Sequence, residues 1–210
     1  MTRRGLMIAN ALKSGDLPSG YTALEYLQST GTQYIDTGFK PNQDTRAVVD
    51  CNIAGTMGSY GCFGARDYTN SRSFWFGKAS SAYKSCYFAY KQNSQATTLA
   101  AGYCDARHTF DANKNKLYID GTQVVSLATA TFSVNYNFFL FAMNDDYQSS
   151  GNPQARLGGT ITLYSAKIYD NDVLVRDFVP CLDRSNIPCL YDKVNKQTYY
   201  NVGTGTFNYG

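Results

Sequence analysis

Acidic side chains are the first candidates for chemistry, and almost all of them are aspartates. Fifteen of the sixteen acidic residues are Asp, and Glu25 is the single glutamate. A glycoside hydrolase needs two carboxyl groups about 5–5.5 Å apart for retention, or about 6.5–9.5 Å apart for inversion. Glu25 has no acidic residue two positions away, and the adjacent Asp145 and Asp146 would face opposite sides of a strand. We therefore expect a protein that is not an enzyme, with a glycoside hydrolase as a distant alternative.

His108 is the only histidine, so any histidine-based triad would have to use it. Its neighbours alternate in polarity as in a strand, and we expect a structural, hydrogen-bonded side chain. No Gly-x-Ser-x-Gly motif accompanies it. The Gly-rich segment 55–61 matches neither the Walker nor the dinucleotide-binding fingerprint. No catalytic residue is therefore predicted.

Two polar segments, around residues 66–70 and 144–150, are instead typical of ligand binding. A sugar site combines aromatic faces with Asn, Asp and Arg hydrogen-bonding groups. Binding residues also concentrate in loops that a rigid scaffold holds. The candidate ligand-binding residues are Arg66, Asp67, Tyr68, Asn70, Trp75, Asn144, Asp145, Asp146 and Tyr147.

Trp75 stands between Phe74 and Phe76 on a predicted strand, so its side chain faces away from both neighbours. We expect Trp75 to be buried in the core and the two phenylalanines to face outward. The reverse arrangement satisfies the same pattern and is the alternative.

No cofactor is predicted, and calcium is the alternative. Ca²⁺ takes about six to eight oxygen ligands. Asn144, Asp145 and Asp146 supply such oxygens in one loop, and Asp67 or Asp105 could add another. The same Asn-Asp-Asp run is also ordinary turn chemistry.

The six cysteines are Cys51, Cys62, Cys86, Cys104, Cys181 and Cys189. None forms a C-x-x-C pair, which argues against a zinc ribbon or a thioredoxin-type motif. Several stand in apolar alternation, where a thiol acts as a small hydrophobic side chain. We expect mostly reduced, structural cysteines, with Cys181 and Cys189 the best candidates for a bridge because they are close in sequence.

Charge and hydropathy limit the classes of partner. The net charge of +3 and the pI near 8.4 are too mild for a nucleic-acid reader, which usually carries a basic stripe. No apolar run is long enough to span a membrane, and the apolar stretch 6–8 is too short for a secretory signal. Residues 1–20 end in a Gly-, Ser-, Asp- and Pro-containing stretch that is typical of an arm or linker. We expect neither nucleic-acid binding nor membrane insertion.

Short strands with tight turns follow from residue 21 to the end, and no segment there shows a helical period. Period-two alternation predicts the strands, and Asp120-Gly121, 170–172 and 195–196 are typical of hairpin turns. This pattern predicts a two-sheet antiparallel jelly-roll sandwich over residues 21–210. The predicted strands are 24–28, 33–37, 45–54, 61–65, 73–79, 85–91, 97–101, 116–120, 122–128, 137–143, 160–169, 173–179, 188–191 and 197–202.

Several segments carry a family resemblance. They are residues 24–38 (LEYLQSTGTQYIDTG), the stretch 108–121 with its Lys116–Gly121 hairpin, residues 158–170, residues 175–181 and the Gly-Thr-Gly-Thr-Phe of 203–207. Together they resemble the laminin-G-like, concanavalin-A-like domains of phage and prophage virion proteins from gut bacteria. Calcium held by loop oxygens is frequent in such lectin relatives, and the fold by itself does not identify a ligand.

The resemblance implies a virion protein that displays a lectin-like domain for attachment to a host-surface glycan or for particle decoration. Residues 1–20 would join it to other virion proteins, and a homo-oligomer is expected. A purely structural capsid or tail decoration protein is one alternative. A bacterial adhesin, with an extracellular or cell-surface location in place of the virion, is another.

Overall fold

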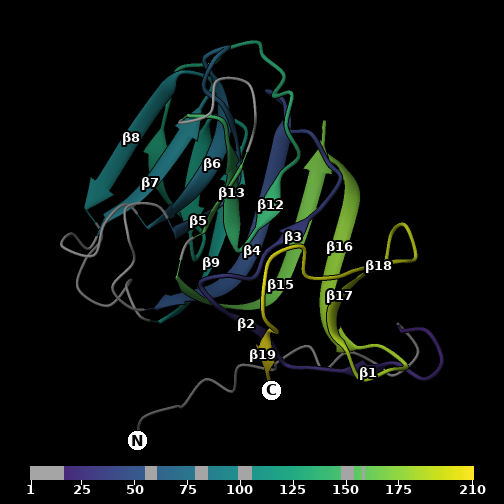
Figure 1. Ribbon diagram of the computed structural model, residues 1–210. Coiled ribbons are helices and arrows are strands. Elements are labelled where there is room, and N and C mark those ends of the chain that lie inside the picture. The colour runs from purple at the N-terminus through teal and green to yellow at the C-terminus, as the bar shows by residue number, and fades with distance from the viewer. Residues whose placement is uncertain (1–16, 55–60, 79–84, 99–105, 148–153, 158) are drawn as a thin grey trace, which may run out of the picture.

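The computed structural model describes residues 17–54, 61–78, 85–98, 106–147, 154–157 and 159–210 (Figure 1). Over these residues the secondary structure is entirely strands and turns, with no helix. Two sheets enclose one hydrophobic core, which confirms the predicted all-β, two-sheet jelly-roll-like sandwich. None of the described segments forms a helix long and apolar enough to cross a membrane.

The larger sheet is antiparallel throughout its described strands. These strands are β1 (Thr22–Ala23), β2 (Leu27–Thr30), β4 (Thr45–Ala54), β9 (Arg107–Asn113), β10 (Lys116–Ile119), β11 (Thr122–Ser126), β15 (Thr160–Asp170), β16 (Val173–Leu182), β17 (Pro188–Asp192), β18 (Gln197–Tyr199) and β19 (Asn208–Tyr209). Their order is β11-β10-β9-β4-β15-β16-β17-β18, with β1 beside β16, β2 beside β15 and β19 beside β2.

The smaller sheet has the order β14-β13-β5-β6-β7-β8, and β12 pairs with β3 and β5. Its strands are β3 (Ile35–Asp36), β5 (Gly61–Asp67), β6 (Arg72–Lys78), β7 (Ser85–Tyr90), β8 (Asn93–Thr98), β12 (Phe139–Leu140), β13 (Ala142–Asp145) and β14 (Gln154–Leu157). The pair β13–β5 is parallel, whereas the other described pairs of this sheet are antiparallel. Parallel pairing brings the last residues of β5 and β13 to the same end of the sandwich.

Alternating side chains fill the space between the sheets. In β4 every second residue from Thr45 to Ile53 is buried and the residues between them are partly exposed, as the sequence predicts. The smaller sheet contributes Phe63, Phe74, Phe76 and Phe88, each 0% exposed. Replacing one such phenylalanine by alanine typically costs about 3–5 kcal/mol, so these aromatic residues are a main source of stability.

Trp75 is buried, with 2% of its surface exposed, but the expectation that its phenylalanine neighbours face outward is wrong. Phe74 and Phe76 belong to the core between the sheets, so Trp75 lies on the outer face of the smaller sheet. There it packs with Ala89 and Met143 in a separate cluster, which Tyr87 joins.

Two predicted hairpin turns have the expected backbone. Asp120 and Gly121 have φ angles of +49° and +79°, as a type I′ turn requires. Asn171 and Asp172 have φ angles of +47° and +64° and connect β15 to β16. The imidazole Nδ1 of His108 lies 2.6 Å from the Asp120 carboxylate, so the expected hydrogen bond of the sole histidine is present at the first of these turns.

Some strand predictions need correction. β9 lies between β4 and β10 and pairs with both, but it is absent from the predicted strands. The short strands β1, β14 and β19 are absent as well. The predicted strand 97–101 covers only the end of β8, because residues 99–101 lie outside the described residues. Residues 1–16 of the proposed arm also lie outside them. Leu17, at its end, packs with Tyr21 against a cluster on β16 and β17.

Cys181 and Cys189 face each other across β16 and β17, with their Sγ atoms 3.5 Å apart. Both are free thiols, as are the buried Cys51 and Cys86, so the structure does not form the candidate bridge. The hydrogen bond to Cys181, together with burial, raises the pKa of the Cys189 thiol. Cys104 and the side chain of Cys62 lie outside the described residues.

Candidate functional site

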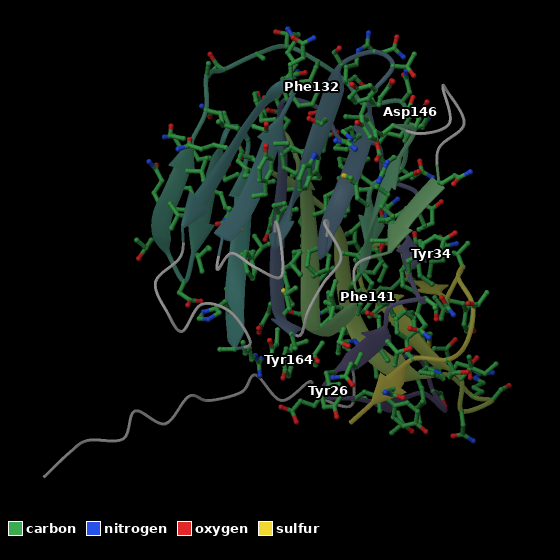
Figure 2. All side chains as sticks on the ribbon, turned by 60° about the vertical axis from the view of Figure 1, so that its left-hand side comes forward. Tyr26, Tyr34, Phe132, Phe141, Asp146 and Tyr164 are labelled. Atoms are coloured by element: carbon green, nitrogen blue, oxygen red, sulfur yellow. The ribbon has the colours of Figure 1, made fainter. Side chains whose placement is uncertain are left out.

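The two predicted ligand-binding segments meet at one end of the smaller sheet. Parallel pairing of β5 with β13 sets Arg66 beside Asp145 in register. Figure 2 shows Asp146 at this end, together with Phe132, whereas Tyr26 and Tyr164 lie at the opposite end of the molecule. Residues that are about 80 positions apart in the sequence are therefore neighbours because of one strand pairing.

An ion-pair cluster joins three of these strands. Arg66 donates hydrogen bonds from Nε and an Nη atom to the two carboxylate oxygens of Asp145, at 2.8 and 2.7 Å. Arg156, on β14, donates from Nε to the same carboxylate. The Asp145 side chain is 0% exposed, against 17% for Arg66 and 22% for Arg156. One buried carboxylate thus holds two guanidinium groups on the outer face of the sheet.

Two exposed tyrosines lie beside this cluster. Tyr68 and Tyr147 are 52% and 48% exposed, and their rings meet edge to face with centroids 4.6 Å apart. The guanidinium of Arg66 lies 5.5 Å from the Tyr68 ring and 5.0 Å from the Tyr147 ring. Arg156 lies 5.1 Å from the ring of Tyr147. These cation–π contacts hold the aromatic rings in place while their outer edges remain open to solvent.

Asp146 is buried and accepts hydrogen bonds from the loop that carries Tyr68. Its carboxylate accepts hydrogen bonds from the backbone N–H groups of Tyr68 and Thr69 at 2.6 and 3.4 Å, and from the Tyr136 hydroxyl at 3.1 Å. Burial alone would raise the pKa of Asp146, but the hydrogen bonds from Thr69, Tyr68 and Tyr136 outweigh it and lower that pKa. Burial and the same carboxylate raise the pKa of Tyr136 to about 12.

Asp67 and Asn70 shape the loop between β5 and β6. The buried Asp67 carboxylate accepts hydrogen bonds from the backbone and side-chain N–H groups of Asn70, at 3.1 and 2.9 Å. It also accepts one from the side chain of Asn135 at 2.7 Å. The Ser71 N–H closes the turn onto the Tyr68 carbonyl at 3.0 Å. These predicted ligand residues therefore support the loop rather than line a cavity.

The predicted calcium ligands do not converge. The Asn144 side chain donates to the Asn137 carbonyl at 3.1 Å, whereas the carboxylates of Asp145 and Asp146 accept from different donors. Within the described residues, no three His, Cys, Asp or Glu side chains form a group that could hold a metal ion. Asp105 lies outside the described residues, so the calcium alternative is not tested for its full set of candidate ligands.

A pocket of about 590 Å³ opens on the outer face of β5, β6 and β7. Trp75 and Tyr87 line it with rings stacked at 5.1 Å between centroids and 4° between planes. Arg66 and Tyr68 line it as well, so the pocket is continuous with the ion-pair cluster. Ser73, Gln92 and Ser94 add hydrogen-bonding groups. Aromatic surface, hydroxyl groups and cations thus share one concave site.

The structure brings together some of the predicted residues and adds others. Arg66, Tyr68 and Trp75 line the pocket, and Asp145 and Tyr147 contact these residues. Sequence reasoning did not identify the following lining or supporting residues: Arg72, Ser73, Tyr87, Lys91, Gln92, Ser94 and Arg156. The alternation that places Trp75 outward also places Ser73 outward, and that signal was available in the sequence.

The chain has no match among family models and none among curated proteins. The resemblance to phage lectin-like domains therefore stays a prediction.

Proposed function

We propose that this chain is a glycan-binding module and that the pocket on β5, β6 and β7 is its binding site. The observation that carries the proposal is the pocket of about 590 Å³, in which aromatic rings, hydroxyl groups and guanidinium groups face one space. Small-molecule sites usually measure about 300–1,000 Å³ and combine apolar walls with a few polar groups. The volume suits one or two sugar rings.

The chemistry of the lining matches that of a sugar. A sugar ring has apolar C–H faces that pack on aromatic rings and a rim of hydroxyl groups that exchange hydrogen bonds. Tyr68 and Tyr87 supply aromatic surface, and the Ser94 hydroxyl lies 2.9 Å from that of Tyr87. The site is built on paired strands, so little ordering of the protein is needed on binding.

The biological setting is part of the proposal. The resemblance of residues 21–210 to phage virion domains supports a virion protein that presents this pocket to glycans of a bacterial host. Residues 1–20 would then attach the domain to other virion proteins, as a homo-oligomer. A role as a purely structural decoration protein uses the same attachment but needs no sugar site.

A glycan array with the purified full-length chain, followed by calorimetry on the best ligand, tests the proposal. We expect Tyr68→Ala and Tyr87→Ala each to weaken binding by about tenfold, because an aromatic contact at the centre of a site is typically worth more than about 1 kcal/mol. The matched control is Tyr209→Ala, which removes a similarly exposed tyrosine, 47% exposed, on the C-terminal strand β19.

Two results would contradict the proposal. If Tyr209→Ala weakened binding as much as Tyr68→Ala, the sugar would bind outside the pocket. Failure of the wild-type chain to bind any host-derived glycan, combined with normal incorporation into particles, would favour the structural decoration protein.

A further inference from the structure

The pocket carries an excess of positive charge at its lining. Arg66, Arg72 and Lys91 line it, and no Asp or Glu does. Arg66 is on β5, Arg72 begins β6, and Lys91 follows β7. A sugar without charge has no need of three cations in one site.

The buried acids near the pocket leave this excess in place. Asp145 compensates Arg66, but it is shared with Arg156, so one negative charge faces two positive ones. Asp67 and Asp146 are 0% and 1% exposed, and their carboxylates accept hydrogen bonds from Asn, Tyr and backbone groups. Their donors turn them toward the loop, and none of them lines the pocket.

Of the three cations that line the pocket, Arg72 and Lys91 differ from Arg66, which pairs with Asp145. Arg72 donates to the Ser133 carbonyl at 3.2 Å, and among the described residues neither Arg72 nor Lys91 takes part in an ion pair. Lys91 begins the β7–β8 turn at a φ of +56°, where its N–H donates to the Ser73 carbonyl at 2.8 Å. This backbone contact sets Lys91 beside Ser73, and both residues line the pocket.

We propose that the pocket selects acidic sugars, in which a carboxylate or sulfate group lies against Arg72 and Lys91 while the ring packs on the tyrosines. This inference rests on the proposed glycan-binding function. The guanidinium fork of Arg72 suits the two oxygens of a planar anion, and Lys91 adds a point charge. Opposite charge also accelerates the encounter and makes binding depend on ionic strength.

Matched ligand pairs test the proposal with the full-length chain. Calorimetry compares oligogalacturonate with its methyl ester, which keeps the sugar rings and removes the charges. A second pair, heparin oligosaccharide and its desulfated, N-acetylated form, separates sulfate from carboxylate. We expect at least one charged ligand to bind about tenfold or more tightly than its uncharged partner. We also expect its affinity to fall as the salt concentration rises from 50 to about 500 mM.

Two substitutions locate the effect. Arg72→Gln and Lys91→Gln should each reduce the preference for the charged ligand over its methyl ester by about fivefold to tenfold. Lys114→Gln is the matched control, because Lys114 also stands at a hairpin turn with a φ of +54° but is paired with Asp172 on the larger sheet. It should keep the preference intact.

The outcomes separate the inference from the function on which it rests. Equal binding of charged and uncharged partners overturns the acidic-sugar inference and leaves the glycan-binding function standing. The acidic-sugar inference is also overturned if Lys114→Gln removes the charge preference as strongly as Lys91→Gln does. The anion would then bind outside the pocket. If no sugar of any kind binds, the proposed function itself fails.

Discussion

The arginines on the outer faces of the two sheets are paired with carboxylates in different ways. On the larger sheet Arg46 pairs with Asp111 and Arg107 with Asp50, both at 2.7 Å. Each guanidinium also covers a tyrosine, at 5.3 Å over Tyr169 for Arg46 and at 3.6 Å over Tyr164 for Arg107. Both arginines are therefore paired, and the rings of Tyr164 and Tyr169 are covered by them.

The smaller sheet differs in how its arginines are paired with carboxylates. Arg66 and Arg156 share the single buried carboxylate of Asp145, and the tyrosines beside them remain about half exposed. Arg72 and Lys91 add cations at the pocket. Arginine thus covers the neighbouring tyrosine rings on the larger sheet, whereas the tyrosine rings beside the arginines of the smaller sheet stay exposed to solvent. The difference lies in the number of carboxylates and in how deeply they are buried.

The largest effect that distinguishes the faces should come from removing one carboxylate from each. We expect Asp145→Asn to lower the free energy of unfolding by about 3–5 kcal/mol, because it removes a fully buried negative charge that two partly buried guanidinium groups share. Asp50→Asn should cost about 0–1 kcal/mol, since its pair with Arg107 is well exposed to solvent. Urea unfolding followed by the fluorescence of Trp75 measures both values. Equal losses would show that the two faces do not differ in this way.

A smaller effect should come from the glycine beside Trp75. Gly64 has a φ of +137°, and a Cβ there would lie 2.4 Å from the Phe74 carbonyl oxygen and 2.5 Å from the Trp75 Cβ. We expect Gly64→Ala to destabilise the fold by about 3 kcal/mol, through the clash and the strained backbone together. Gly121, on the larger sheet, is the matched control. It has a φ of +79° but open space around it, so Gly121→Ala should cost about 1 kcal/mol.

Thermal unfolding of the two alanine variants reports the difference as a shift in Tm. A Gly64→Ala protein as stable as Gly121→Ala would mean that the strand next to Trp75 can move aside. In that case the packing around the Trp75 indole ring could rearrange, and this part of the pocket lining would not be rigid.

The alternation of β4 and the turn at Asp120-Gly121 were predictable because each depends on local chemistry. Residues that alternate in hydrophobicity bury one face, and Asp-Gly between two strands favours a turn with positive φ angles. The side on which Trp75 lies was not predictable in this way. Period two separates Trp75 from Phe74 and Phe76, but either face could have been the inner one.

The candidate site depends on strand register, which no local pattern contains. Arg66 meets Asp145 only because β5 and β13 pair in parallel, and Arg156 joins them only because β14 pairs with β13. Tyr87 and Lys91 come to Trp75 and Ser73 through the pairing of β6 with β7. The sequence therefore identified residue types that bind ligands, whereas the division into lining residues and loop supports required the fold.

The smallest predicted effect concerns the acid that holds the Tyr68 loop. Hydrogen bonds lower the folded-state pKa of Asp146, so its stabilising contribution is present above the unfolded value of about 3.9 and is lost as the pH falls through the lower folded value. We expect Asp146→Asn to lower the free energy of unfolding by about 1–2 kcal/mol at pH 7. Below about pH 4 the gap between variant and wild type should narrow.

Urea unfolding at pH 7, 4 and 3 measures this gap. Asp172→Asn is the control: it removes the same charge from an exposed turn of the larger sheet, where the Asp172 side chain is 69% exposed. It separates the loss of net charge from the loss of buried hydrogen bonds. A gap for Asp146→Asn that stays constant from pH 7 to pH 3 would mean that the carboxylate acts by its shape and not by its charge. The protonated acid would then hold the Tyr68 loop as firmly as the carboxylate does, and the amide would hold it less firmly at every pH.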